Sequence, residues 1–177
     1  MPFDHRLASE NDRVVLEQIM DRAIGQLQLD FLSPEQVAAS RAFMGIDTQL
    51  IRDRTYFIVE ENGVAAGCGG WSRRATLYGG DHSKGLREAR LLNPVTEPAR
   101  IRAMYTDPDF TRRGVGSLIL KLCEKAAAAE GFTEIEMMAT LSGEPLYRAA
   151  GYRVTATTAD GVGDVSVPLL RMCKKLD

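Results

Sequence analysis

Two arginines and two glycines stand directly ahead of a long apolar-periodic stretch, in FTRRGVGSLILKLCEKAAAAEGF (residues 110–132). Glycine in a helix costs about 1 kcal/mol relative to alanine, so Gly114 and Gly116 indicate that something approaches the backbone closely. The free N–H groups at a helix start favour an anion, and the guanidinium groups of Arg112 and Arg113 suit phosphate oxygens. The pattern predicts a phosphate-binding turn at a helix N-terminus.

Two well-known phosphate-binding loops do not fit this turn. A Walker A loop needs G-x-x-x-x-G-K-[ST] and a dinucleotide fingerprint needs G-x-G-x-x-G. Counting from Gly114, both patterns require a glycine where the chain has Ile119. Two interpretations remain, a shorter Arg-Gly-x-Gly loop that holds a pyrophosphate and a tight strand-to-helix turn that binds nothing.

The elements on either side of the turn predict a mixed α/β fold. A strand over Ala99–Asp107 ends at Pro108, and the helix after the turn has an apolar stripe and stops at Gly131. A further strand is expected over Thr133–Thr140. Strand, helix and strand in this order favour a parallel pair joined by a crossover.

The remaining elements are predicted from local turn and cap signals. Asn62-Gly63 is the preferred pair for a tight hairpin turn, and Ser33-Pro34 with Gln36 is a helix start. The expected elements are a short strand at His5–Ala8, helices over residues 10–31 and from Ser33 to about Met44, hairpin strands at Thr55–Glu60 and Val64–Trp71, a long loop over Ser72–Pro98, a short helix ending at Gly151, and closing strands at Tyr152–Thr158 and Val165–Lys174.

Length and composition favour one soluble domain over residues 1–177, either a monomer or a homodimer. A net charge of −2 gives no general attraction to nucleic acid or anionic membrane. Three separated cysteines without a C-x-x-C pair, and only two histidines, argue against a zinc site, so we expect no metal. The chain shows no signal core and no apolar run of membrane-spanning length. We therefore expect a cytoplasmic protein with no membrane partner.

The stretch from Ile101 to Tyr152 resembles the GNAT acetyltransferase superfamily. The signature is a hydrophobic strand ending near a proline, an [RQ]-x-x-G-x-[GA] loop, a helix, a strand and then Y-x-x-x-G-[FY]. The loop is TRRGVG (residues 111–116) and the last motif is YRAAGY (residues 147–152). The loop departs from the signature at its first position, which is Thr111 instead of Gln or Arg.

The resemblance implies a GNAT-like fold, with a mainly antiparallel twisted sheet, a central parallel strand pair and flanking helices. It also implies that acetyl-CoA is the acyl donor and that a primary amine of a small molecule, or an exposed amino group, is the acceptor in a ternary complex. The pantetheine arm would pair with the backbone of Met104, Tyr105 and Thr106. The pyrophosphate would lie on the loop that comprises Arg112, Arg113, Gly114, Val115, Gly116 and Ser117.

Acetyl transfer to an amine needs an acid for the leaving thiolate and a base for the ammonium. The resemblance makes Tyr147 the general acid, and a phenol with a pKa of about 10 is protonated at neutral pH. Base candidates are Glu60 at the end of the first hairpin strand, and Asp81 with His82 in the long loop. Each of these three side chains could instead be solvated. The pair in the loop is favoured because long loops in compact domains are often functional.

Two other function classes fit the same residues. One is a non-catalytic acyl-CoA-binding or regulatory domain that kept the fold and lost turnover. The other is an interaction module whose glycine turn binds no ligand. An enzyme-bound acyl intermediate is not expected, because Ser142 lacks the G-x-S-x-G context of a nucleophile and the cysteines resemble small core residues.

Overall fold

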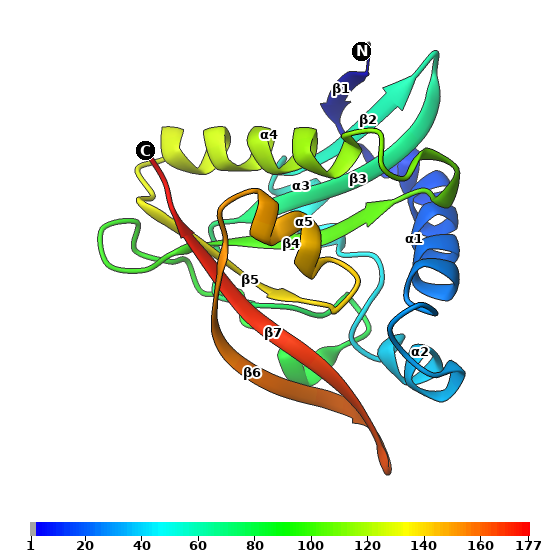
Figure 1. Cartoon of the computed structure of the whole chain (residues 1–177). Coiled ribbons are helices and arrows are strands. Elements are labelled where there is room, and N and C mark those ends of the chain that lie inside the picture. Colours follow the sequence, from blue (N-terminus) through cyan, green and yellow to red (C-terminus); the bar gives the residue numbers. More distant parts are fainter. Residues whose placement is uncertain (1–2) are drawn as a thin grey trace.

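A single seven-stranded sheet organises the chain, for which the computed structural model describes residues 3–177. The strand order is β1-β2-β3-β4-β5-β7-β6 (Figure 1). Neighbouring strands are antiparallel except for β4 and β5, which form the central parallel pair. This arrangement confirms the predicted fold class. The strands are β1 (Asp4–Leu7), β2 (Tyr56–Glu61), β3 (Val64–Ser72), β4 (Ala99–Thr106), β5 (Glu134–Ala139), β6 (Arg153–Val162) and β7 (Val165–Lys175).

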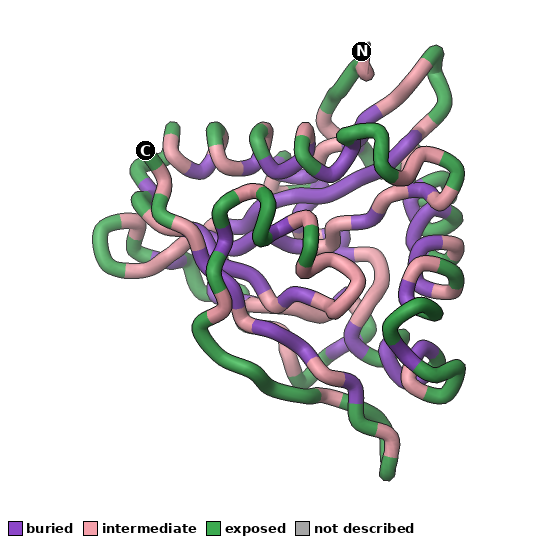
Figure 2. Tube along the Cα trace, viewed as in Figure 1, coloured by how far each residue is buried: buried purple, intermediate pink, exposed green. Residues whose placement is uncertain are grey.

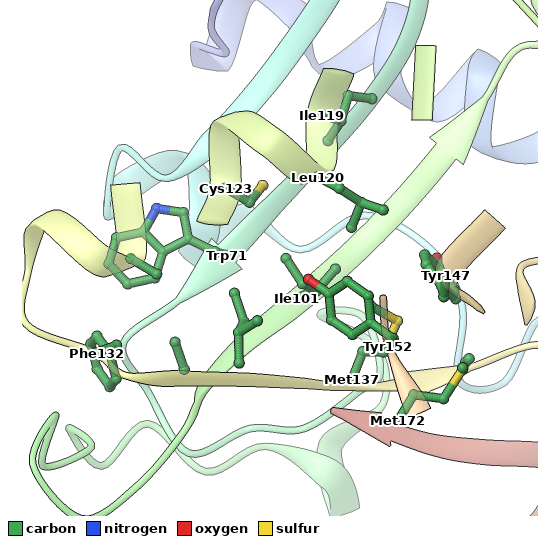
Figure 3. Packing of buried hydrophobic residues seen from close by; sticks show 14 of the residues in the cluster. Trp71, Ile101, Ile119, Leu120, Cys123, Phe132, Met137, Tyr147, Tyr152 and Met172 are labelled. Carbon is green, nitrogen blue, oxygen red and sulfur yellow. The ribbon is translucent and has the colours of Figure 1, made fainter. Parts of the chain in front are cut away.

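Helices cover both faces of the sheet. They are α1 (Arg13–Leu27), α2 (Pro34–Ser40), α3 (Thr48–Arg52), α4 (Val115–Ala129) and α5 (Glu144–Ala149). The apolar stripe of α4 faces the sheet, and Ile119, Cys123 and Ala127 on that stripe have no solvent exposure (Figure 2). Figure 3 shows Ile119 and Cys123 in the same cluster of buried side chains as Trp71, Phe132 and Met137. The opposite face packs against α1, whose Leu16 and Ile19 are buried with Ile58.

Several elements differ from the sequence prediction, and α1 spans Arg13–Leu27 instead of residues 10–31. The helix α3 was not predicted, because five residues are too few to show a helical period; Asp47 caps it by accepting a hydrogen bond from the Gln49 amide at 3.2 Å. The helix α2 ends at Ser40 instead of near Met44, because the chain continues there in turns. The strand β6 reaches Val162 instead of stopping at Thr158, so β6 and β7 form a long hairpin arm that extends from the sheet (Figure 1).

The stretch between β3 and β4 is a long connection, as predicted, and it is held by polar contacts. The backbone of Ala75 and Thr76 donates to the carbonyls of Arg90 and Glu88 at 2.9 Å each. Arg102 on β4 donates to the carbonyls of Thr76 and Gly79, at 3.2 and 2.6 Å. These bonds fix the connection against β4. Within residues 3–177, no helix combines the length and the apolar character needed to cross a membrane.

Candidate active site

The central feature of the site is the separation of β4 from β5. The two strands pair only at Ala99 with Ile135 and at Arg100 with Glu136. Beyond Arg100, the β5 side of β4 has no ladder partner, while its other edge pairs with β3 as far as Thr106. Backbone groups of β4 that face this gap are therefore available to a ligand, since buried amides and carbonyls need hydrogen-bond partners.

A bulge in β4 lies at the start of this gap. The register between β3 and β4 shifts between Cys68 and Gly70, and Ala103 on β4 has a φ of +52°, in the left-handed region. The missing side chain of Gly69 makes room for the bulge, because a Cβ there would lie 2.4 Å from Met104 Sδ and 2.7 Å from Ile119 Cγ2. The glycine-rich part of β3 thus lets α4 pack close to the bulge.

The turn that precedes α4 presents a row of backbone donors. Gly114 is the N-cap with a φ of +88°, and Arg112 has a φ of +61°. The first hydrogen bond of the helix runs from Leu118 N to Gly114 O at 3.0 Å. Within residues 3–177, the N–H groups of residues 112–117 have no hydrogen-bond partner. Such donors at the positive end of a helix form an anion-binding site.

The side chains of the two arginines in the turn have different partners. Arg113 pairs with Glu61 on β2, and its guanidinium lies over the rings of Phe3 and Phe110 at 5.2 and 5.4 Å. Arg112 is exposed and lines the cleft in front of α4, with no ion pair to any residue that the structure describes. Arg112 therefore lies in the cleft without an ion-pair partner among the described residues, whereas the guanidinium of Arg113 is paired with Glu61.

Tyr147 lies on α5, in front of the gap between β4 and β5 (Figure 1). Its side chain is 8% exposed and packs edge-on against Tyr152, with ring centroids 6.2 Å apart. Gly143 permits this position, because a Cβ there would lie 2.7 Å from Tyr147 Cε2. Burial raises the pKa of the Tyr147 phenol above its ordinary value. The hydroxyl is therefore protonated at neutral pH.

Two clefts meet at Tyr147. The larger, of about 720 Å³, runs along the α4 turn and past the free edge of β4; it includes Met104, Tyr105, Thr106, Arg112, Gly114, Val115, Gly116 and Ser117. The smaller, of about 80 Å³, lies on the other side of the bulge between β4, β5 and the connection before β4. Its walls include Phe43, Leu77, Tyr78, Ile101, Met137 and Leu169. Tyr147 and Met104 line both clefts, so their junction is where two bound molecules would meet.

Residues 20–152 match the model of the acetyltransferase (GNAT) family. The chain belongs to the GNAT family. This membership confirms the resemblance seen in the sequence, and it makes the protein an acetyl-CoA-dependent acyltransferase. The chain matches no curated protein sequence.

Solved structures of GNAT proteins share the fold over nearly the whole chain. A GCN5-related N-acetyltransferase from Rhodopseudomonas palustris is 20% identical, with a TM-score of 0.72 and coverage of 99% of this chain and 97% of that one. The yncA acetyltransferase from Salmonella typhimurium, solved with acetyl-CoA, is 18% identical, with a TM-score of 0.68 and coverage of 100% and 95%. The paiA N-acetyltransferase from Thermoplasma acidophilum, solved with coenzyme A, is 14% identical, with a TM-score of 0.63 and coverage of 99% of both chains.

The three base candidates of this GNAT protein lie outside the clefts that contain Tyr147. Glu60 accepts hydrogen bonds from Arg6 at 2.9 and 3.1 Å at the β1 edge of the sheet. Asp81 accepts from the amide and hydroxyl of Thr48 at 3.0 and 2.8 Å. The exposed ring of His82 places Nε2 2.6 Å from the Arg41 carbonyl oxygen. The structure does not bring these groups together with Tyr147.

Sequence reasoning missed the residues that form the small cleft. Leu77, Tyr78 and Gly79 belong to the long connection, in which only Asp81 and His82 were singled out from the sequence as base candidates. Met44 and Gly45 come from the segment after α2 that was assigned to a helix end. The sequence offered one signal here, the adjacent glycines Gly79 and Gly80. In the structure Gly79 has a φ of +104°, which favours glycine. Across residues 3–177, no grouping of three or more His, Cys, Asp or Glu side chains is arranged to hold a metal ion.

Proposed function

We propose that this GNAT protein transfers the acetyl group of acetyl-CoA directly to a primary amine. The observation that carries the proposal is the row of unpartnered N–H groups at residues 112–117, in one cleft with the free edge of β4 and Tyr147. Acetyl-CoA needs an anion site for its pyrophosphate, backbone partners for its amide-containing arm and a proton donor beside its sulfur. The N–H groups of residues 112–117 would supply the anion site, the free edge of β4 the backbone partners, and Tyr147 the proton donor.

The donor cleft offers groups that match the chemistry of acetyl-CoA. A Cβ at Gly114 would have nothing within 4 Å, so the turn is open to a bulky anion on that side. The amides of residues 112–117 would hold the pyrophosphate, and Arg112 would add a positive charge. The backbone of Met104, Tyr105 and Thr106 would pair with the pantetheine arm along the free edge of β4. Arg113 would contribute its backbone N–H, while its guanidinium pairs with Glu61.

Tyr147 would act as the acid in the transfer. As the amine nitrogen bonds to the acetyl carbon, the carbon–sulfur bond breaks and its electron pair stays on sulfur. Tyr147 then gives its hydroxyl proton to that sulfur, and the proton that the attacking nitrogen loses after the bond forms returns to the Tyr147 oxygen. Burial weakens Tyr147 as an acid, and it also disfavours a charged thiolate in the same cleft.

The acceptor would enter the small cleft, where apolar side chains stand beside polar groups that make up about half of the exposed surface. Side chains such as Phe43, Ile101 and Leu169 would contact its body, while the amino group reaches Tyr147 at the junction. We therefore propose a primary amine carried on a small apolar group as the preferred acceptor class. Burial of such a group contributes about 25 cal/mol per Å² of apolar surface.

A matched pair of variants tests the donor site. Arg112→Ala removes the arginine at the free amides, whereas Arg113→Ala removes the adjacent arginine that pairs with Glu61. We expect the first to weaken acetyl-CoA binding several-fold by calorimetry and the second to leave the affinity close to the parent. Equal loss in both variants, or in neither, would contradict the placement of the pyrophosphate.

Release of the CoA thiol tests turnover. The acceptor panel comprises benzylamine, putrescine, glycinamide and a peptide with a free N-terminal alanine. We expect benzylamine to give the highest kcat/KM. Acetyl-CoA binding without thiol release for any acceptor would favour a non-catalytic acyl-CoA-binding domain, and no thermal stabilisation by acetyl-CoA would favour an interaction module.

A further inference from the structure

An acceptor amine must lose a proton before it attacks, because an alkyl ammonium has a pKa of about 10 and no free electron pair. None of the described residues that line the small cleft is Asp, Glu or His. The large cleft is lined by one described acidic side chain, the exposed Asp30. The group that removes the proton must therefore be a side chain linked to a base outside the cleft, or Asp30.

Tyr78 is linked to such a base. Its hydroxyl donates a hydrogen bond to Asp160 Oδ2 at 2.7 Å. This bond joins the connection before β4 to strand β6. The ring of Tyr78 lines the small cleft and packs edge-on against Phe43, with centroids 6.0 Å apart. The second oxygen of Asp160 accepts from the Gly161 amide at 2.7 Å. The carboxylate is thus held on both oxygens, and the phenol proton is directed at it.

We propose that Tyr78 and Asp160 form a proton relay that deprotonates the acceptor amine. The ammonium N–H proton moves to Tyr78 Oη while the phenol proton moves to Asp160 Oδ2. The products are a neutral amine and a neutral carboxylic acid, and Tyr78 carries one proton before and after. Asp160 is partly exposed, so it returns its proton to solvent. This assignment rests on the proposed function.

The electrostatics of the pair suit a relay better than a phenolate base. Burial, and the hydrogen bond to Asp160, raise the pKa of Tyr78 to about 12. Asp160 is the charged group that acts on this hydroxyl among residues 3–177, and Phe43 and Leu169 supply neutral surfaces beside it. A standing phenolate is therefore scarce at neutral pH, and the phenol oxygen accepts a proton only as it gives one away.

Two variants and one matched control test the relay. Tyr78→Phe keeps the ring and removes the hydroxyl, and Asp160→Asn keeps the shape and removes the base. Asp164→Asn is the control, because Asp164 is exposed in the turn of the same β6–β7 arm. Each protein is assayed from pH 6 to 10 with the best substrate of the acceptor panel, where chemistry limits the rate. Acetyl-CoA affinity is measured in parallel.

We expect both relay variants to lose about 10²-fold in kcat at pH 7 with little change in acetyl-CoA affinity. The loss should shrink as the pH approaches 10, because the acceptor then arrives as free amine. The control should follow the parent throughout. Rates equal to the parent, or a loss that does not change with pH, would overturn the relay. Asp30→Asn is assayed in the same way. A loss of kcat at pH 7 in this variant, with parental kcat in both relay variants, would overturn the relay and assign the base to Asp30. A parent that acetylates no acceptor would refute the proposed function instead.

Discussion

Tyr147 is the proposed acid, and substituting it distinguishes a catalytic role from a packing role. Tyr147→Phe keeps the contact with Tyr152 and removes only the hydroxyl, which donates to no residue within 3–177. We expect kcat to fall roughly 10²- to 10⁴-fold with little change in acetyl-CoA affinity or melting temperature. Single-turnover rates and calorimetry provide the measurement. Parental turnover in the variant would exclude Tyr147 as the acid.

Gly114 is expected to be needed for its backbone conformation. Its φ of +88° is disfavoured for a residue with a side chain, and valine there costs about 1 to 2 kcal/mol. Gly163 in the β6–β7 turn, with a φ of +56°, is a matched control far from the cleft, because neither Cβ would meet an atom within 4 Å. We expect both valine variants to lose similar stability but only Gly114→Val to lose acetyl-CoA affinity. Equal affinities would contradict the anion site.

Individual residues were predictable where a local motif defines them. The glycine turn before α4 and the place of Tyr147 on a short helix were predicted because a few adjacent letters carry each pattern; their roles in binding and catalysis stay predictions. Arg113 was assigned with Arg112, because neighbouring loop residues do not reveal in which direction each side chain points. Tyr78 was missed because its partner Asp160 lies 82 residues away along the chain.

At the scale of elements, the connection before β4 depends on one buried carboxylate. Asp47 precedes α3, is fully buried and accepts hydrogen bonds from Arg102 on β4 and from Arg87 on the connection. We expect Asp47→Asn to lower the free energy of unfolding by about 3 kcal/mol, because removing one partner leaves a buried guanidinium without a counter-charge. Asp21→Asn breaks an exposed pair with Arg41 and should change stability by less than about 1 kcal/mol. Denaturant unfolding of both variants measures the difference.

Strands and long helices were predictable because each has a period or a strong turn signal. The hairpin with Asn62-Gly63 and the helix α4 appear close to their predicted bounds. The path of the connection over residues 73–98 was not predictable, because it is set by ion pairs such as Arg74 with Asp53 instead of by an apolar pattern. One wall of the small cleft, formed by Leu77, Tyr78 and Gly79, belongs to this connection and could not be predicted either.

For the whole molecule, the buried phenols and thiols set the alkaline limit of stability. Burial raises the pKa of Tyr56, Tyr105, Tyr147 and Tyr152, and it raises the pKa of Cys68 to about 12. In the unfolded chain these groups ionise near pH 8.5 for cysteine and about 10 for tyrosine. Above those values, the folded state retains protons that the unfolded state has lost, so stability falls as pH rises.

We expect the urea midpoint to be nearly constant from pH 7 to 8 and to fall steadily from about pH 9 to 11. The decline should be steeper than in a variant in which Tyr56 is replaced by Phe, although that variant also loses the hydrogen bond to the Ala103 carbonyl at 2.6 Å. A midpoint that rises over this range would contradict the pKa directions.

The gap between β4 and β5 has a consequence for how the sheet is completed. Strands β4 and β5, which join the two halves of the sheet, pair at only two residue pairs, and the gap lies beyond them. A ligand whose amides pair with the free edge of β4 would fill that gap in the way that a short additional strand would. Acetyl-CoA bound in this way would be a removable piece of secondary structure, and the sheet would gain and lose a segment with every catalytic cycle.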